Sequence, residues 1–298
     1  WLKSPKKTPN LIQQPGLSWT LQNSNAYGLT HFWLSQTSTL QAQLILFGPH
    51  SFHFTFTQIC SQAGTGQEAF FILLEKKMVL LGVDLRSSPK HPSAIAGLNA
   101  GSEVAVSFLD TVHTDEEIVG IAETLNPSLI AIGTPLGLPD GLCCLEPTCK
   151  CTSHSSQQKG RQLELELAQM GISCFFTSKG SIIRKLIYRA IALSKQLQKL
   201  GLDVIEVYPH ATKVVLFGDS VPPKNSSGNL EYMKEHLPQL IGGLEPYLDS
   251  MDRNTCDALI NSYTAHLHSR NGTDLLGSTQ EGLLALPKLL PDEARITA

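Results

Sequence analysis

The sequence predicts an α/β domain in which helices flank a mixed sheet, preceded by a segment of different character. Short apolar runs bounded by turn-forming residues recur from residue 79 onward, and helical patterns of ten or more residues alternate with them. The composition of the chain also changes near residue 78. With 298 residues, 42% of them hydrophobic, and a formal net charge of -3, the chain is long enough for one or two domains with a full core.

Residues 1–77 differ in composition from the rest of the chain. They hold all three Trp and seven of the eleven Phe, but only two of the twenty-six acidic residues, Glu68 and Glu75. The first Met of the sequence is Met78, directly before a predicted strand. We therefore expect 1–77 to be a non-domain or poorly ordered extension, such as translated upstream sequence, and 78–298 to be the folded domain.

Two alternatives stay open for residues 1–77. The apolar runs at 44–47 and 52–56 suit strands of a small β-rich domain. A targeting segment would be poor in acidic residues, as this segment is, but also rich in Arg. The first Arg of the chain is Arg86, which disfavours the second alternative.

The predicted sheet begins with Val79–Leu85, a nearly continuous apolar run with one acid, Asp84, near its end. Such a run, followed by turn-forming residues, is typical of a strand buried on both faces. The short runs Ser93–Leu98 and Glu103–Leu109 then complete an antiparallel meander.

The elements that follow alternate between helix and strand. A helix is predicted over Thr114–Thr124, because Thr114 can cap it and three acids occupy its first turn. A second buried strand, Pro127–Gly133, ends in a turn with two Pro. The remaining predicted elements are helices Gln162–Met170 and Ile182–Leu200, strand Val204–Tyr208, and helices Leu230–Leu248 and Cys256–Ser269, which finish the chain.

Composition also excludes some classes of protein. No apolar run approaches the roughly 18 residues that a membrane helix needs, and we find no secretory signal pattern. Seven unevenly spread Cys do not suggest a disulfide framework. We therefore expect a cytoplasmic protein with no membrane partner, in which any nucleic-acid binding comes from a local basic patch.

Three acids occupy positions where an isolated charge is unfavourable. Asp84 and Glu206 lie on buried strands, and Asp257 opens a helix beside polar residues. Clustered carboxylates supply the oxygen ligands that Mg²⁺ or Mn²⁺ prefers, and two such ions can activate water in phosphodiester cleavage. The alternative is that each acid makes a separate structural hydrogen bond, and spacing alone does not decide between these interpretations.

A basic stripe follows the helix predicted over Ile182–Leu200. At about 100° per residue its five cations fall within roughly 140° of arc, opposite the apolar face. A solvated surface face is the ordinary interpretation, and a track for a phosphate backbone is the alternative. The residues of the stripe are Arg184, Lys185, Arg189, Lys195 and Lys199, and Arg161 and Lys179 could extend it.

Four cysteines lie within nine residues: Cys143, Cys144, Cys149 and Cys151. Zinc binds four Cys or His ligands, but structural sites usually draw them from two separated pairs. The sequence therefore leaves zinc binding, redox chemistry and unliganded loop thiols open.

Six motifs follow one another along the chain: Val79–Leu85, Ile130–Pro139, Gly160-Arg161 with Glu164, Val204–His210, Asp257–Ala265 and Gly282–Pro287. Together they resemble the uncharacterised domain-of-unknown-function family 429. The resemblance covers 78–290 and implies a ribonuclease H-like fold and a nuclease activity. It assigns Asp84 to the first strand, Glu206 to the later strand and Asp257 to the C-terminal helix as the site acids.

One departure from the family pattern puts the activity in doubt. The strand before Thr134-Pro135 typically ends in an acid in this family, and Gly133 stands there in this chain. Two hypotheses follow: a metal-dependent nuclease acting on nucleic acid, or a non-catalytic ribonuclease H-like module that binds nucleic acid or protein with its site impaired at Gly133.

Overall fold

The computed structural model describes residues 78–288 except 89, 102, 154–158 and 224–225, together with five short strands before residue 78. The chain divides into two compact units, Trp1–Lys76 and Lys77–Ala298. In the first, β1 (Leu21–Asn23) pairs with β2 (Thr30–Phe32), and β3 (Gln43–Leu46), β4 (Phe52–Ile59) and β5 (Phe70–Leu73) form an antiparallel sheet. The rest of 1–77 lies outside the described residues, so its interpretation as an extension stays a prediction.

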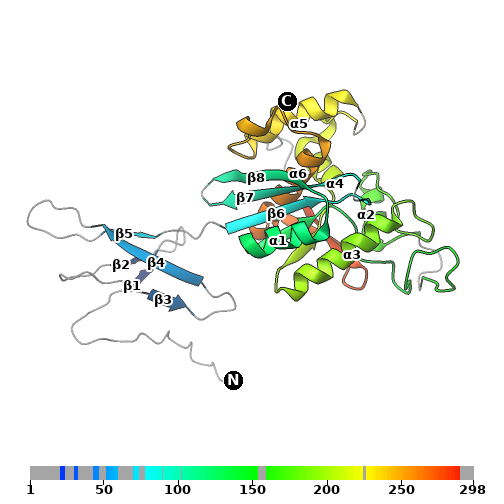
Figure 1. Cartoon of the computed structure of the whole chain (residues 1–298), viewed down its shortest axis with the longest axis horizontal. Coiled ribbons are helices and arrows are strands. Elements are labelled where there is room, and N and C mark those ends of the chain that lie inside the picture. Colours follow the sequence, from blue (N-terminus) through cyan, green and yellow to red (C-terminus); the bar gives the residue numbers. More distant parts are fainter. Residues whose placement is uncertain are drawn as a thin grey trace, which may run out of the picture. The chain divides into compact units, whose positions relative to one another are not determined.

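The second unit is built on a seven-stranded mixed sheet (Figure 1). Its strands are β6 (Met78–Asp84), β7 (Ser93–Ala100), β8 (Val104–Val112), β9 (Leu129–Ile132), β10 (Val204–Glu206), β11 (Thr273–Ser278) and β12 (Gly282–Pro287). They lie in the order β11-β12-β10-β9-β6-β7-β8. β6, β7 and β8 form the predicted antiparallel meander, and β9 and β10 run parallel to β6. The predicted mixed α/β sheet is therefore confirmed, with the antiparallel β7 on one side of β6 and the parallel β9 on the other.

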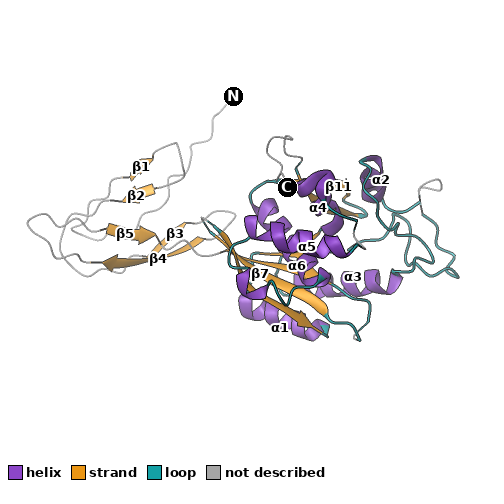
Figure 2. Ribbon diagram, turned by 90° about the horizontal axis from the view of Figure 1, so that it is seen from above, coloured by secondary structure: helices purple, strands orange, loops and turns teal. Residues whose placement is uncertain are grey.

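Helices cover both faces of this sheet (Figures 1 and 2). One face packs against α1 (Asp115–Leu125) and α3 (Arg184–Lys199), and the other packs mainly against α4 (Pro209–Phe217), α5 (Ser227–His236) and α6 (Arg253–Ser269). A shorter helix, α2 (Gln162–Gln169), packs with α4 and β12 in a third cluster. None of the helices in the described residues is long and apolar enough to cross a membrane.

Side-chain alternation along β6 assigns each of its residues to one face. Leu81 and Val83 pack in the cluster with α1 and α3, whereas Leu80 packs in the cluster with α6. Because successive strand residues point to opposite faces, Gly82 and Asp84 face α6. Both faces of the strand are buried, which explains its nearly continuous apolar sequence.

The predicted start of the first helix is confirmed, and the reason is a capping box. Thr114 accepts a hydrogen bond from the backbone N–H of Glu117 at 3.2 Å, and the Glu117 carboxylate accepts one from the N–H of Thr114 at 3.1 Å. Each side chain satisfies a donor that the first helical turn leaves unpaired.

Two predictions about the C-terminal part were wrong. The helix expected over Leu230–Leu248 ends at His236 and gives way to short 3₁₀ turns, because Pro238 and Pro246 have no N–H for a continuing helix. The chain does not finish with the last helix either. β11 and β12 follow it as an antiparallel hairpin at the edge of the sheet.

The close contact between β6 and α6 requires glycine at position 82. A Cβ atom there would lie 2.2 Å from the backbone O of Ala258 and 2.3 Å from the backbone N of Ser262. We expect Gly82→Ala to lower the free energy of unfolding by about 2–3 kcal/mol, because the helix would have to move off the strand. Urea unfolding of the full chain measures this.

The matched control is Gly120→Ala in α1, where an added Cβ meets nothing within 4 Å. Since alanine is the better helix former, this change should raise stability by about 0.5–1 kcal/mol. Equal effects of the two substitutions would contradict the packing described for β6.

Candidate functional site at the carboxyl ends of the parallel strands

The carboxyl ends of β6, β9 and β10 open into a cavity of about 240 Å³. Ligands of open α/β sheets commonly bind outside such strand ends. Asp84, Gly133 and Glu206 all lie at this edge, since each ends or directly follows one of the three strands. Residues that line the cavity include Asp84, Arg86, Gly133, Thr134, Arg161, Glu164, Phe175, Glu206 and Tyr208.

Asp84 and Glu206 reach the cavity from opposite faces of the sheet. In the strand register, Ile132 pairs with both Val83 and Glu206, so the side chains of these three residues share one face. That is the face covered by α1 and α3. Asp84 is one residue beyond Val83 and therefore faces α6. The two acids line one cavity, but they do not form one carboxylate cluster.

Glu206 is bound by a buried arginine. Arg161 donates from Nη1 to Oε2 at 2.8 Å and from Nη2 to Oε1 at 2.7 Å, and the backbone N–H of Leu136 donates to Oε2 at 2.7 Å. Arg161 is 1% exposed and Glu206 is 4% exposed. This bidentate pair supplies the compensation that a buried strand acid requires.

A second carboxylate completes the surroundings of Arg161. Glu164 accepts from the Arg161 Nε at 3.0 Å and also from the backbone N–H of Thr177 at 2.7 Å. Burial alone would lower the pKa of Arg161, but the charges of Glu206 and then Glu164 outweigh burial and raise it. The guanidinium therefore stays charged inside the domain.

Fewer residues of the predicted basic track are available at the surface of the folded chain. Arg161 is buried, so it has no surface to offer a phosphate backbone. Arg184 pairs with Glu146 at 3.5 Å, and Arg189 pairs with Asp115 at 2.8 Å. Lys179 donates to the carbonyl of Cys149. Exposed along α3 are Lys185, Lys195 and Lys199.

Asp257 lies at the same end of the sheet as Asp84 and on the same face. α6 runs antiparallel to β6, because its C-terminal neighbour Arg270 bonds the carbonyl of Gly101 near the start of β6 while Ala258 and Ser262 cover Gly82. The N-terminal turn of α6 therefore reaches the end of β6 where Asp84 lies.

A lysine already neutralises Asp257. Lys213 of α4 forms an ion pair with the Asp257 carboxylate, and the two residues are 5% and 7% exposed. With His210 and Asn229 they line a separate pocket of about 10 Å³, which has room for a single water. Asp257 does not line the larger cavity.

Asn261 of α6 fills the space beside Gly133. A Cβ at position 133 would lie 2.5 Å from Asn261 Nδ2, which donates to the carbonyl of Val83 at 2.9 Å. Asn261 Oδ1 has no hydrogen-bond partner among the described residues. An acid at position 133 would therefore need a smaller residue at 261.

These residues do not fit a metal centre built from three carboxylates. Mg²⁺ and Mn²⁺ need several oxygen ligands that converge. Both oxygens of Glu206 accept from Arg161, Asp257 pairs with Lys213, and Gly133 has no side chain. Among the described His, Cys, Asp and Glu residues, the group of three or more whose ligand atoms converge is the cysteine cluster, and it contains no acid.

Two further ionisable groups in the cavity wall are held neutral. Burial, reinforced by Cys174 and Asp257, raises the pKa of Tyr208 to about 12, and its hydroxyl donates to the carbonyl of Ser173 at 3.0 Å. Burial and then Glu164 raise the pKa of Cys174 to about 11, against the opposing effect of Arg161. Neither group is an acid or base near neutral pH.

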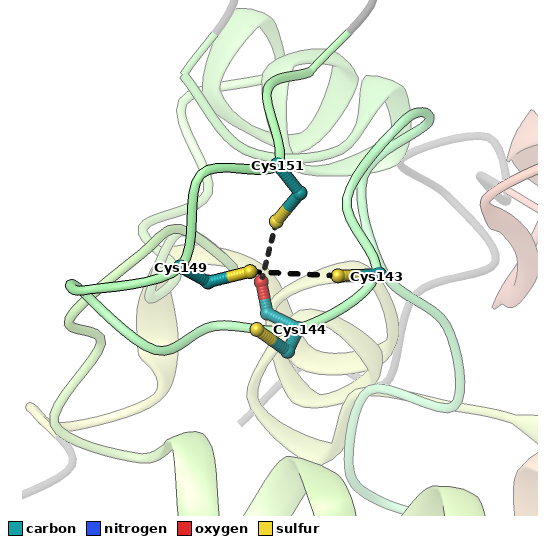
Figure 3. A group of neighbouring side chains, drawn as sticks. All are labelled: Cys143, Cys144, Cys149 and Cys151. Carbon is teal, nitrogen blue, oxygen red and sulfur yellow. Dashed lines mark hydrogen bonds between the residues drawn. The ribbon is translucent and has the colours of Figure 1, made fainter.

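The predicted zinc residues are brought together in the loop between β9 and α2. The sulfur atoms of Cys143, Cys144, Cys149 and Cys151 all lie within 4.8 Å of one another (Figure 3).

The sequence patterns assigned no role to Lys213, Asn261 or Tyr208. Tyr208 and Lys213 lie within seven residues of Glu206 in the sequence, and this proximity is the signal that could have pointed to them.

Removing the buried cation should destabilise the domain strongly. We expect Arg161→Met to lower the free energy of unfolding by about 3–5 kcal/mol, because Glu206 and Glu164 would stay buried without compensation.

Denaturant unfolding of the full chain measures this loss. Arg184→Met is the control, since its ion pair with Glu146 is half-exposed and contributes within about 1 kcal/mol. A loss in Arg161→Met no larger than that in Arg184→Met would refute the charge argument.

Comparison with known proteins yields only distant structural likeness. A scan against protein-family models and a search of curated proteins both find no match. The solved structure of Thermus thermophilus RuvC is similar at a TM-score of 0.40 and 14% identity, covering 71% of this chain and 100% of RuvC. T. thermophilus RuvC in complex with a Holliday junction substrate is similar at a TM-score of 0.38 and 13% identity, covering 70% and 100% of the two chains. Likeness at this level has no bearing on the activity of the chain.

Proposed function

We propose that the 77–298 unit is a ribonuclease H-like module that binds single-stranded nucleic acid at its strand-end cavity, without a carboxylate-bound pair of metal ions. The observation that carries the proposal is that two of the three candidate site acids are paired with cations. Glu206 and Asp257 are both neutralised by side chains of the same chain, Arg161 and Lys213. The proposal includes membership of the domain-of-unknown-function family 429.

The exposed lysines of α3 support binding of a phosphate backbone. Lys185, Lys195 and Lys199 fall within roughly 80° of arc and span about 21 Å of the helix. That length corresponds to about six nucleotides at a 3.4 Å rise. The N-terminal end of α3 lies at the cavity, because Ile183 and Leu186 line it, and Lys185 is at this same end of the helix.

The cavity itself supports binding of one nucleotide. Its lining includes Arg86, which is exposed, and Phe175, whose exposed fraction is 61%. An exposed aromatic ring beside cations is the usual combination for a single strand, and stacking contributes about 1–3 kcal/mol per base. A volume of about 240 Å³ is smaller than most ligand pockets, so it suits one nucleotide better than a large cofactor.

The second candidate is the metal-dependent nuclease. It is favoured by Asp84, which lines the cavity at the end of the central strand and shares a face with Asp257. In that case Asp84 and Asp257 would hold the ion, and Lys213 would have to release Asp257 first. Arg161 would stay with Glu206.

One experiment separates the two candidates. The full chain is incubated with labelled single-stranded, duplex, hybrid and branched substrates, with and without Mg²⁺ or Mn²⁺, beside Asp84→Asn. We expect binding of single strands without cutting, and equal or tighter binding by Asp84→Asn, since one negative charge leaves the cavity. Metal-dependent cutting that disappears in Asp84→Asn would overturn the proposal in favour of the nuclease, and an absence of binding to every substrate would refute both.

The backbone track makes a separate prediction about salt dependence. Lys195→Glu should weaken single-strand binding by about tenfold at low salt and reduce the slope of log K against log salt by about 0.7, because one phosphate contact is lost. The control, Lys234→Glu, makes the same charge change in α5 on the other face of the sheet. Equal losses in both variants would show that binding follows net charge and not the α3 track.

A further inference from the structure

The loop between β9 and α2 contains four thiols at one point. Among its described residues, 133–153 and 159–161, it has no helix or strand, so the backbone itself provides little order. The sulfurs of Cys143 and Cys149 are 3.6 Å apart, and all four sulfurs lie within 4.8 Å of one another. Figure 3 shows the thiols of Cys143 and Cys149 facing each other, and the thiol of Cys151 directed at the carbonyl oxygen of Cys144.

This spacing matches a single tetrahedral ion. Zinc–sulfur bonds of about 2.3 Å in a tetrahedron place the sulfurs about 3.8 Å apart. A [4Fe–4S] cluster binds each thiolate to a different iron, and a [2Fe–2S] cluster divides them between two irons, so either holds some of the sulfurs further apart. A disulfide needs two sulfurs at about 2.05 Å, and the cysteines of the described residues are free.

The surrounding contacts hold the four thiols in place. Leu145, between the two pairs of cysteines, is fully buried, and its backbone N–H donates to the hydroxyl of Tyr188 on α3 at 2.6 Å. Its carbonyl accepts from the N–H of Gly180 at 2.8 Å. The N–H of Cys149 donates to the carbonyl of Glu146 at 3.2 Å. Anchors on both sides reduce the ordering that metal binding would require.

The local charge also suits a thiolate site. Four thiolates with Zn²⁺ carry a net charge of −2, which needs cations nearby. Lys179 donates to the carbonyl of Cys149, and Lys150 lies between Cys149 and Cys151 in the chain. Three of the four cysteines are half-buried, and Cys143 is exposed.

We propose that Cys143, Cys144, Cys149 and Cys151 bind one structural Zn²⁺ that fixes this loop. Binding displaces the thiol protons to solvent, with no change in oxidation state. Four protein ligands fill the coordination shell, so the ion has no open position for a substrate. The proposal does not rest on nucleic-acid binding. The same loop begins with Gly133 and carries Leu136, the donor to Glu206, so the ion would also steady one wall of the strand-end cavity.

The first test measures the metal content of the full chain, purified under reducing conditions, by mass spectrometry. We expect about one zinc per chain, removable by a strong chelator, and restored one-to-one by added Zn²⁺. Co²⁺ added to the chelated chain should give the strong visible absorption of a tetrahedral thiolate complex. Loss of the metal should lower the melting temperature and speed protease cleavage within 139–153 about tenfold.

Cys149→Ser should lose the zinc and the cobalt spectrum. Cys174→Ser is the matched control, because Cys174 is also half-buried but lies outside the cluster. If Cys149→Ser does not fold, the cobalt titration of the wild-type chain decides alone. Stoichiometric iron in place of zinc, a Cys143–Cys149 disulfide in the reduced preparation, no bound metal, or an unchanged metal content in Cys149→Ser would each overturn the proposal.

Discussion

The buried ion pair between Arg161 and Glu206 determines how the strand ends are arranged. Two charges removed from water stabilise a fold only when they meet in good geometry and their remaining donors and acceptors are satisfied. Here the Arg161 guanidinium donates to Glu164 as well as to Glu206, and the N–H of Leu136, in the loop after β9, also donates to Glu206. Because Arg161 is also the N-cap residue of α2, one interaction joins β10, the β9 loop and α2.

The opposite face of the sheet follows the same pattern with different residues. Lys213 neutralises Asp257, and the amide of Asn261 occupies the space beside Gly133. Of the three acids that the family resemblance implies, Asp84 and Glu206 line the cavity and Asp257 does not. Cations of the chain itself therefore compensate Glu206 on one face of the sheet and Asp257 on the other.

Much of the fold could be predicted because its signals are local. β6 and β9 are buried on both faces and therefore read as continuous apolar runs, and the capping box of α1 lies within four residues. The site could not be predicted to the same depth. The partner of Glu206 is 45 positions away, and the face on which an acid lies depends on strand register. Arg161 looked like a surface cation for the same reason, since sequence shows the charge but not its burial.

The cysteine loop shows a different relation between sequence and structure. The four thiols are close in sequence, so their convergence needs no long-range pairing, yet it depends on the fixed position of Leu145 between them. That position is set by Tyr188 on α3, the helix whose first turn also lines the cavity. α3 therefore supports both the strand-end cavity and the thiol cluster. The irregular segment between β9 and α2 contacts α3 at Leu145 and Glu206 at Leu136. The first contact orders the cysteine loop, and the second orders the cavity wall.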